Sequence, residues 1–359
     1  MQEKRELDER RDDPEALTIQ RGSLPVVYEY LDYLRSFIIG VWVRVGSRFE
    51  KKQEYGYSHF VEHLLFKGSR RGRKKKSAQD IAASLECLGG ELNAFTSREY
   101  SCYYARAATR HFPRAMEVLS DIVMRSTFPL VEYDKEKNVV LEEISMYEDS
   151  PEELSHELLQ STMFAPSLGH SIVGTADIIA KAKRKQVFDY YKKMYRSGRV
   201  FLTVLGNVEQ RDLERELKHF RPIIKGEAVK KVKPKTCKTK GGRRLVRKPI
   251  EQLHLCYGVP GLPMDHDDRY TLHLINTYLG AGMSSRLFQE IREKRGLAYN
   301  VYSFMQSFQD TGLWGFYCAT SPAKGLEVRE ILQRELDLLK KDGIDTATVS
   351  RLKEQIVGG

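Results

Sequence analysis

The stretch "GYSHFVEHLLFKGS", which begins at Gly56, places two histidines and a glutamate within five residues. If this stretch is a helix, His59 and His63 lie one turn apart on the same face, because side chains at positions i and i+4 are neighbours. Two imidazoles in this arrangement can share one metal ion. Glu62 lies next to the second histidine. The segment therefore predicts a metal centre on a helix with a carboxylate beside it.

A third ligand is predicted from the segment "DKEKNVVLEEISMYEDSPEE". In a helix, Glu136 and Glu143 fall on one face, about 20° apart across two turns, and Glu142 points away from it. A carboxylate on a packed face needs a partner, because an unpaired buried charge is costly, and metal ligation supplies one. We therefore assign His59, His63 and Glu143 as ligands. Glu136 would lie behind them and orient a histidine or hold the helix, and Glu142 is the substitute ligand if the register slips.

Two imidazoles, one carboxylate and an open fourth position are the ligand count of a catalytic zinc site. A water at the open position would lie beside Glu62, which can take its proton and pass it to a leaving amine, while zinc polarises the scissile carbonyl. The five cysteines are scattered without Cys-x-x-Cys spacing, which argues against a disulfide framework and against a thiolate metal site.

Strands and helices alternate around these segments. "SFIIGVWVRVGSR", from Ser36, is rich in β-branched residues and predicts a strand, and "ELNAFTSREYSCYYARAAT" predicts two more. Helical periods occur in "SAQDIAASLECLGG" and "RHFPRAMEVLSDIVMRS". Consecutive strands mixed with helices indicate an α+β fold rather than a strict βαβ order.

The two halves of the chain resemble each other. "LECLGGELNAFTSREYSCYYARAAT" parallels "IREKRGLAYNVYSFMQSFQDTGLWGFYCATS", and an apolar helical stretch precedes each. The second copy lacks the His/Glu set, so one half is expected to carry the chemistry. The second copy is also shorter after its glycine, from which we expect a fragment or a shortened chain whose second domain lacks its C-terminal part.

A chain of 359 residues favours two domains, and the basic stretch between the halves predicts the boundary. We assign residues 1–224 to a catalytic metal-binding domain, 225–247 to a linker and 248–359 to a homologous noncatalytic domain. The net charge of +10 is concentrated in this linker and in "RRGRKKK" at residues 70–76, which reads as a solvated loop. Outside these two segments the chain is net acidic, which argues against nucleic acid as a partner.

No apolar run is long enough to span a bilayer, and the N-terminal "MQEKRELDERRDD" has neither an apolar core nor the acid-poor character of a targeting peptide. These features predict a cytoplasmic protein that does not enter a membrane.

His-x-x-Glu-His is the inverzincin order, and the sequence resembles the pitrilysin/insulinase family of zinc metallopeptidases. The likeness is greatest to the small two-domain branch that includes the mitochondrial processing peptidase β subunit. It covers nearly the whole chain through "VGSRFE", "SHFVEHLLFKGS", "LGGELNAFTSREYSCYY", "KEKNVVLEEISMYEDSPEE" and "SSRLFQEIREKRGLAYNVYS". The resemblance implies two homologous α/β sandwich domains that close like a clamshell over a chamber. It also implies one zinc ion per chain, a peptide or unfolded protein segment as substrate, and pairing into a homodimer or with a homologous subunit.

The resemblance also implies roles for single residues. His59, His63 and Glu143 match the zinc ligands, Glu62 the catalytic base and Glu136 the supporting acid.

Four further residues match positions that face the substrate. Asn93 and Ala94 match a strand edge along which the peptide lies, which implies β-augmentation. Arg292 and Tyr299 match a pair that approaches the substrate from the other half.

Two other classes of function stay open at this stage. One is a noncatalytic partner or scaffold subunit of a processing-peptidase-like complex, although such subunits commonly lose motif residues and here all are present. The other is a basic module that binds nucleic acid or an acidic protein through the linker and residues 70–76. Neither basic segment interleaves aromatic residues with its charges, as a single-strand platform would.

Overall fold

The structure is a computed structural model that describes residues 16–164, 166–229, 237 and 239–358. The N-terminal segment used for the localisation prediction and the middle of the predicted linker lie outside these residues. The described residues of Met1–Ser145 and Ser171–Pro234 form one compact unit, called unit 1. Those of Met146–His170 and Lys235–Gly359 form a second, called unit 2. The chain thus passes between the units three times.

Unit 1 is built on a six-stranded sheet in the order β1-β2-β8-β3-β7-β6. Only β2 and β8 pair in parallel, and the other neighbours are antiparallel. The β-branched run predicted as a strand forms β3 in the middle of the sheet, where strand neighbours cover both of its edges. The strands are β1 (Leu17–Arg21), β2 (Leu24–Tyr30), β3 (Ser36–Val43), β6 (Glu91–Thr96), β7 (Ser101–Ala108) and β8 (Val200–Gly206).

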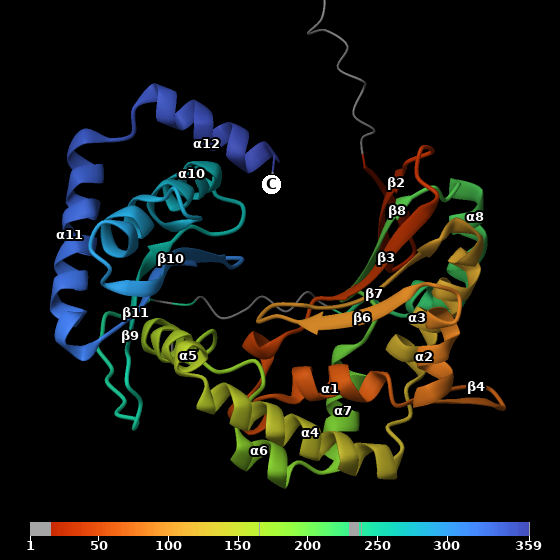
Figure 1. Ribbon diagram of the computed structural model, residues 1–359. Helices are drawn as coiled ribbons and strands as arrows, with labels where there is room; N and C mark the ends of the chain where they lie inside the picture. Colours follow the sequence, from red (N-terminus) through yellow and green to blue (C-terminus); the bar gives the residue numbers. More distant parts are fainter. Residues whose placement is uncertain (1–15, 165, 230–236, 238, 359) are drawn as a thin grey trace, which may run out of the picture. The chain divides into compact units, whose positions relative to one another are not determined.

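The helices of unit 1 pack their apolar sides against one face of this sheet. Figure 1 shows α1, α2 and α3 along that face, with α4 running beside α1. The helices are α1 (Tyr57–Leu65), α2 (Ala78–Glu86), α3 (Phe112–Arg125), α4 (Leu130–Asp149), α6 (Ala176–Lys181), α7 (Arg184–Met194), α8 (Gln210–Glu216) and α9 (Arg221–Lys225). The shared apolar core fixes α1, which carries the His-x-x-Glu-His residues, against the sheet.

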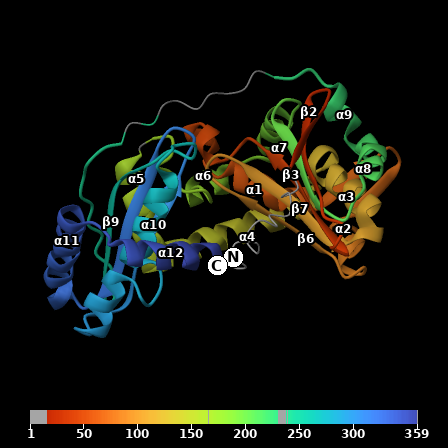
Figure 2. The ribbon, with the colours of Figure 1, turned by 90° about the horizontal axis from the view of Figure 1, so that it is seen from above.

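Unit 2 contains a three-stranded antiparallel sheet in the order β10-β11-β9. Apolar side chains from α10 and α11 pack with one set of alternating strand residues, whereas α5 packs against β9 with the other set. Figure 2 shows these elements from above. They are α5 (Pro151–Met163), β9 (Leu253–Gly261), α10 (Arg269–Gly280), the π-helix η5 (Phe288–Glu293), β10 (Ala298–Ser307), β11 (Gly312–Thr320), α11 (Gly325–Asp342) and α12 (Thr346–Gly358).

The similarity of the halves is confirmed at the level of elements. In unit 1 the order β3, α1, α2, β6, β7, α3 gives a sheet order of β6-β7-β3. In unit 2 the order β9, α10, η5, β10, β11, α11 gives β10-β11-β9. The predicted mixed α/β class with mostly antiparallel sheets is therefore correct.

The helix α5 groups with unit 2, although the sequence interpretation placed all of residues 1–224 in the first domain. The helix α4 ends at Asp149 because Pro151 cannot continue it, and Ser150 caps the new helix by accepting the amide of Glu153 at 3.4 Å. A hydrogen bond connects α5 to the sheet of unit 2: the Tyr302 hydroxyl on β10 donates to the Glu152 carboxylate on α5 at 2.5 Å. Such a contact between distant segments has no periodic signature in the sequence.

The basic segment at residues 70–76 is not a plain loop. It forms a hairpin of β4 (Gly68–Arg71) and β5 (Lys74–Ser77). Arg71 and Lys76 both bind the buried carboxylate of Asp121 on α3, at 2.7 and 3.0 Å. Part of the positive charge is thus neutralised inside the fold.

No helix among the described residues is long and apolar enough to cross a membrane.

The position of α1 depends on the residues that precede it. Gly56, at the N-cap, has a φ of 92°, and a Cβ atom there would lie 2.6 Å from the carbonyl oxygen of Val173. The buried carboxylate of Glu50 accepts the amides of Gly56 and Ser58 at 2.8 and 2.6 Å. It thereby supplies the N-terminal acceptor that the glycine cannot provide.

We expect Glu50→Gln to lower the free energy of unfolding by about 1.5 to 3 kcal/mol, because hydrogen bonds to a charged group contribute on this scale. Chemical denaturation of the variant would measure the loss. Glu86→Gln, at the exposed last position of α2, is the matched control and should change stability little. Equal stability of wild type and Glu50→Gln would show that this carboxylate does not hold the helix.

Candidate metal centre

The structure brings together the side chains of His59 and His63 on α1 and of Glu143 on α4. Nε2 of His59 lies 3.5 Å from Oε1 of Glu143, and Nε2 of His63 lies 3.5 Å from Oε2. One potential ligand atom from each of the three residues lies within 4.8 Å of the other two. Glu142, the substitute candidate, is exposed on another side of α4 and outside this group.

Glu136 lies outside the donor group and contacts one of its members, His63. Its Oε2 is 3.2 Å from Nδ1 of His63, and its Oε1 is 2.9 Å from Nζ of Lys67. Its two partners hold the pKa of Glu136 below its usual range against the effect of burial. An ionised Glu136 orients the His63 ring so that Nε2 faces Glu143, as carboxylates behind metal-binding histidines commonly do.

The two histidines have opposite electrostatic surroundings. Burial, with repulsion from His63, lowers the pKa of His59 to about 4, so this ring is neutral at pH 7. Burial also acts on His63, but its hydrogen bonds with Glu136 and Glu143 outweigh this and raise its pKa to about 9. The carboxylates thus favour a positive charge at this position.

Glu62 points from the same helix toward β6. Burial raises the pKa of its carboxyl group, and a hydrogen bond from the Thr96 side chain opposes the rise. Its Oε2 is buried and has no hydrogen-bond partner among the described residues. A buried carboxylate oxygen without a partner is unfavourable in a resting fold, and it is expected where a group must accept a proton.

The donor set fits a zinc ion. Two imidazole nitrogens and a carboxylate are the ligand types of catalytic zinc sites, and the surrounding carboxylates compensate a dication. The elements that carry the donors belong to the core of unit 1, so the donors do not depend on a mobile segment.

Asn93 and Ala94 lie on β6, the edge strand of the sheet. Within the described part of the chain only β7 pairs with β6, so the outer edge of β6 has no strand neighbour. The amide of Ala94 donates to Oδ1 of its neighbour Asn93 at 2.8 Å. Because α1 packs against β6, this open edge belongs to the same region as Glu62.

Arg292 and Tyr299 lie in unit 2, on η5 and β10, and contact each other. The Arg292 guanidinium lies 4.5 Å from the centroid of the Tyr299 ring, and Tyr299 is 77% exposed. An exposed cation–π pair of this kind offers both a charge and an aromatic face to a ligand. Its predicted role toward a substrate stays a prediction.

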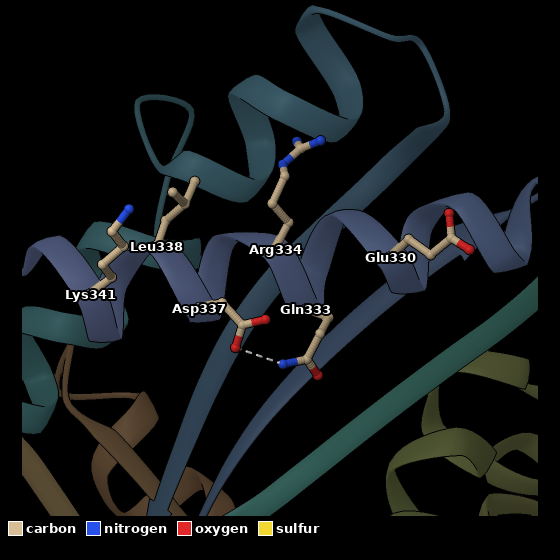
Figure 3. Close-up of a pocket in the computed structure, with 6 residues that line it drawn as sticks. All are labelled: Glu330, Gln333, Arg334, Asp337, Leu338 and Lys341. Atoms are coloured by element: carbon tan, nitrogen blue, oxygen red, sulfur yellow. Dashed lines mark hydrogen bonds between the residues drawn. The ribbon is translucent and has the colours of Figure 1, made fainter.

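Unit 2 offers no second metal-binding group among its described residues. A hollow on its surface is lined by residues of the single helix α11, where Gln333 donates to Asp337 at 3.0 Å (Figure 3). Four of the six lining residues are charged, and none is a predicted site residue; they are Glu330, Gln333, Arg334, Asp337, Leu338 and Lys341.

Sequence reasoning missed Lys67, Glu50 and Thr96. Lys67 follows His63 by four residues but lies beyond Leu65, where α1 ends, so the i+4 rule for helices does not place it. Glu50 and Thr96 reach the site through space from a loop and a strand, and no spacing rule connects them to α1.

We expect Glu136→Gln to weaken zinc binding about 10- to 100-fold, because losing the charge behind a metal-binding histidine typically has this effect. Competition with a chromogenic chelator would measure the affinity. Glu132→Gln, at the start of α4 and outside the donor group, is the matched control. An unchanged zinc affinity in Glu136→Gln would show that Glu136 serves the packing of α4 alone.

Fold and site together define a class: a mixed α/β protein with a His-x-x-Glu-His centre in its first unit. The family model described as "Insulinase (Peptidase family M16)" matches residues 26–176, and that described as "Peptidase M16 inactive domain" matches residues 181–356. The chain therefore belongs to the insulinase family, peptidase family M16.

Relatives and solved structures agree with this assignment. The uncharacterized zinc protease YmxG of Bacillus subtilis is 41% identical over 345 residues, which cover 95% of this chain and 82% of the relative. An uncharacterized zinc protease of Streptomyces coelicolor is 38% identical over 353 residues, 95% of this chain and 76% of the relative.

Two solved structures share the fold. One is described as a peptidase M16 inactive domain from Pseudomonas fluorescens, and the other as a protease from Helicobacter pylori. Their TM-scores are 0.87 and 0.85, each at 22% sequence identity. Each alignment covers 96% of this chain and 84% of the matched chain. The match of the second half to an inactive-domain model agrees with the absence of a donor group from the described part of unit 2.

Proposed function

We propose that this protein is a zinc-dependent endopeptidase that hydrolyses peptides and unfolded protein segments. The observation that carries the proposal is the joint placement of His59, His63 and Glu143 with the partnerless carboxylate oxygen of Glu62 on the same helix. A metal site alone needs no such base. A site for hydrolysis does.

The chemistry divides between the metal and the chain. Zinc, when bound to the two histidines and Glu143, polarises a peptide carbonyl and makes water a nucleophile near neutral pH. Glu62 takes the proton of the attacking water on its carboxylate and later gives it to the leaving amine. Glu136 keeps the His63 ring in the orientation that presents Nε2.

The open edge of β6 supports an extended peptide as substrate. Main-chain amides and carbonyls at a free strand edge pair with another extended chain, and the side chains of that chain then alternate between the two sides. We infer that Asn93 and Ala94 hold the peptide in this way beside Glu62.

The side chains on the sheet face opposite the core favour unfolded protein segments as substrates. It carries aromatic side chains in contact, since the rings of Trp42 and Phe201 stack at 5.8 Å and Phe95 meets Trp42 edge-on at 5.9 Å. Phe95 is 41% exposed. Apolar side chains that a folded protein would bury fit such a surface.

The test is digestion of a peptide mixture with detection of new termini by mass spectrometry. We expect cleavage by the zinc-loaded chain, loss of cleavage with a zinc chelator, and none with Glu62→Gln. No cleavage by the zinc-loaded chain, or cleavage by the chain that survives both the chelator and the substitution, would contradict the proposal. Ligand binding that depends steeply on salt and is indifferent to the chelator would favour a basic binding module instead.

A further inference from the structure

We propose that Lys67 is a positioning residue that acts through Glu136 to hold the His63 ring in the orientation that binds the metal. This inference rests on the zinc site of the proposed function and adds to it a residue that is not itself a ligand. The two oxygens of the Glu136 carboxylate have different partners. Oε1 lies 2.9 Å from Nζ of Lys67, and Oε2 lies 3.2 Å from Nδ1 of His63.

The two helices that meet at this carboxylate are fixed by apolar packing. The rings of Phe60 on α1 and Tyr133 on α4 lie 5.1 Å apart, and both residues are buried. Val140, one turn beyond Glu136 on α4, is also buried, and the Tyr133 hydroxyl donates to the carbonyl of Ala182 at 3.0 Å. The backbone at Glu136 therefore has a set position beside α1, and the remaining freedom lies in the glutamate side chain.

That side chain has three rotatable bonds, and a single partner does not fix all of them. The last torsion, which turns the plane of the carboxylate, is the least restricted by its own geometry. A charged donor on the second oxygen removes this freedom. Because Lys67 contacts Oε1, the carboxylate keeps Oε2 toward Nδ1 of His63, and Nε2 of the same ring faces Oε2 of Glu143 at 3.5 Å.

Lys67 is held in place at its own backbone. It follows the end of α1, and its amide donates to the carbonyl of Leu64 at 3.2 Å. The next residue, Gly68, begins β4, and its carbonyl accepts the Thr127 amide at 3.0 Å. The side chains of Lys67 and Glu136 are 27% and 9% exposed, so solvent and salt screen this ion pair less than a pair on the open surface.

An ion pair can also serve packing alone, by compensating the charge of a half-buried glutamate. Such a pair contributes to the stability of the fold and leaves the affinity for zinc unchanged. A positioning residue changes the zinc affinity, and it does so only while Glu136 keeps its carboxylate. The two roles are therefore separated by a double-mutant cycle on zinc binding.

The experiment measures zinc affinity, by competition with a chromogenic chelator, in wild type, Lys67→Met, Glu136→Gln and the double variant. Methionine keeps much of the length of the side chain and removes its charge. We expect Lys67→Met to weaken zinc binding about 3- to 10-fold, less than Glu136→Gln does, because a carboxylate still contacts His63. In the Glu136→Gln background the same substitution should cause no further loss, because the group through which Lys67 acts is gone.

Lys135→Met is the matched control. Lys135 also pairs with a glutamate of α4, Glu132, at 3.0 Å, but both lie outside the donor group, so the variant should bind zinc with wild-type affinity. Crystal structures of metal-free wild type and Lys67→Met give a second readout. The variant should show the Glu136 carboxylate turned or moved away from Nδ1 of His63.

Three outcomes would overturn the inference: wild-type zinc affinity in Lys67→Met, an equal loss with and without the Glu136 carboxylate, or an unmoved Glu136 in the crystal structure of Lys67→Met. A wild-type chain that binds zinc and cleaves no peptide would refute the proposed function and leave these tests of Lys67 valid. A wild-type chain that binds no zinc would refute both.

Discussion

Glu62→Gln is expected to bind one zinc ion per chain and to hydrolyse peptides about 100 to 10,000 times more slowly than wild type, the usual contribution of a general base. The amide has the shape of the carboxylate and leaves His59, His63 and Glu143 in place. It cannot take a proton from water, so the metal site persists without its base. Measurement of kcat/KM on a fluorogenic peptide, together with zinc content, tests both halves of this expectation.

Glu142→Gln on α4 is the matched control for this substitution, because Glu142 is exposed and lies outside the donor group. It should retain both zinc and activity. Turnover by Glu62→Gln at the wild-type rate would mean that Glu62 is not the base.

His63→Ala is expected to lose zinc and, with it, all metal-dependent hydrolysis. The substitution removes one of three protein ligands and also the partner of Glu136 at 3.2 Å. Only His59 and Glu143 then remain, which are fewer protein ligands than catalytic zinc sites use. Elemental analysis measures the zinc, and circular dichroism shows whether the fold is retained.

The control for His63→Ala is His111→Ala, which removes a histidine of unit 1 outside the donor group. It should keep about one zinc per chain. A folded His63→Ala variant with full zinc content would show that the metal is bound elsewhere.

Local periodicity predicted the elements that carry the chemistry. The i and i+4 rule placed His59 and His63 on one side of a helix, and the structure has α1 there. The rotation of 100° per residue placed Glu143, rather than Glu142, on the same helical face as Glu136, and Glu143 is the residue that lies beside the histidines. Their roles as ligands stay a prediction, because the spacing of donors does not by itself bind a metal.

Contacts between distant segments could not be predicted. The grouping of α5 with unit 2 depends on packing against β9, about a hundred residues further along the chain. Residues 70–76 are mostly exposed, as predicted, but they form the hairpin of β4 and β5 rather than a loop. A run of bases does not reveal an acid that two of them bind from elsewhere in the fold. Here Asp121, from α3, binds Arg71 and Lys76. Thr96 escaped notice for the same reason, since β6 meets α1 only in the fold.

The most direct test of zinc-dependent hydrolysis is a zinc titration of the metal-free protein in which bound zinc and peptide cleavage are measured on the same samples. Cleavage should be absent without zinc, rise in proportion to the zinc bound and stop rising at about one zinc per chain. Full cleavage by the metal-free chain, or a chain that binds one zinc at these histidines and cleaves no peptide, would contradict it.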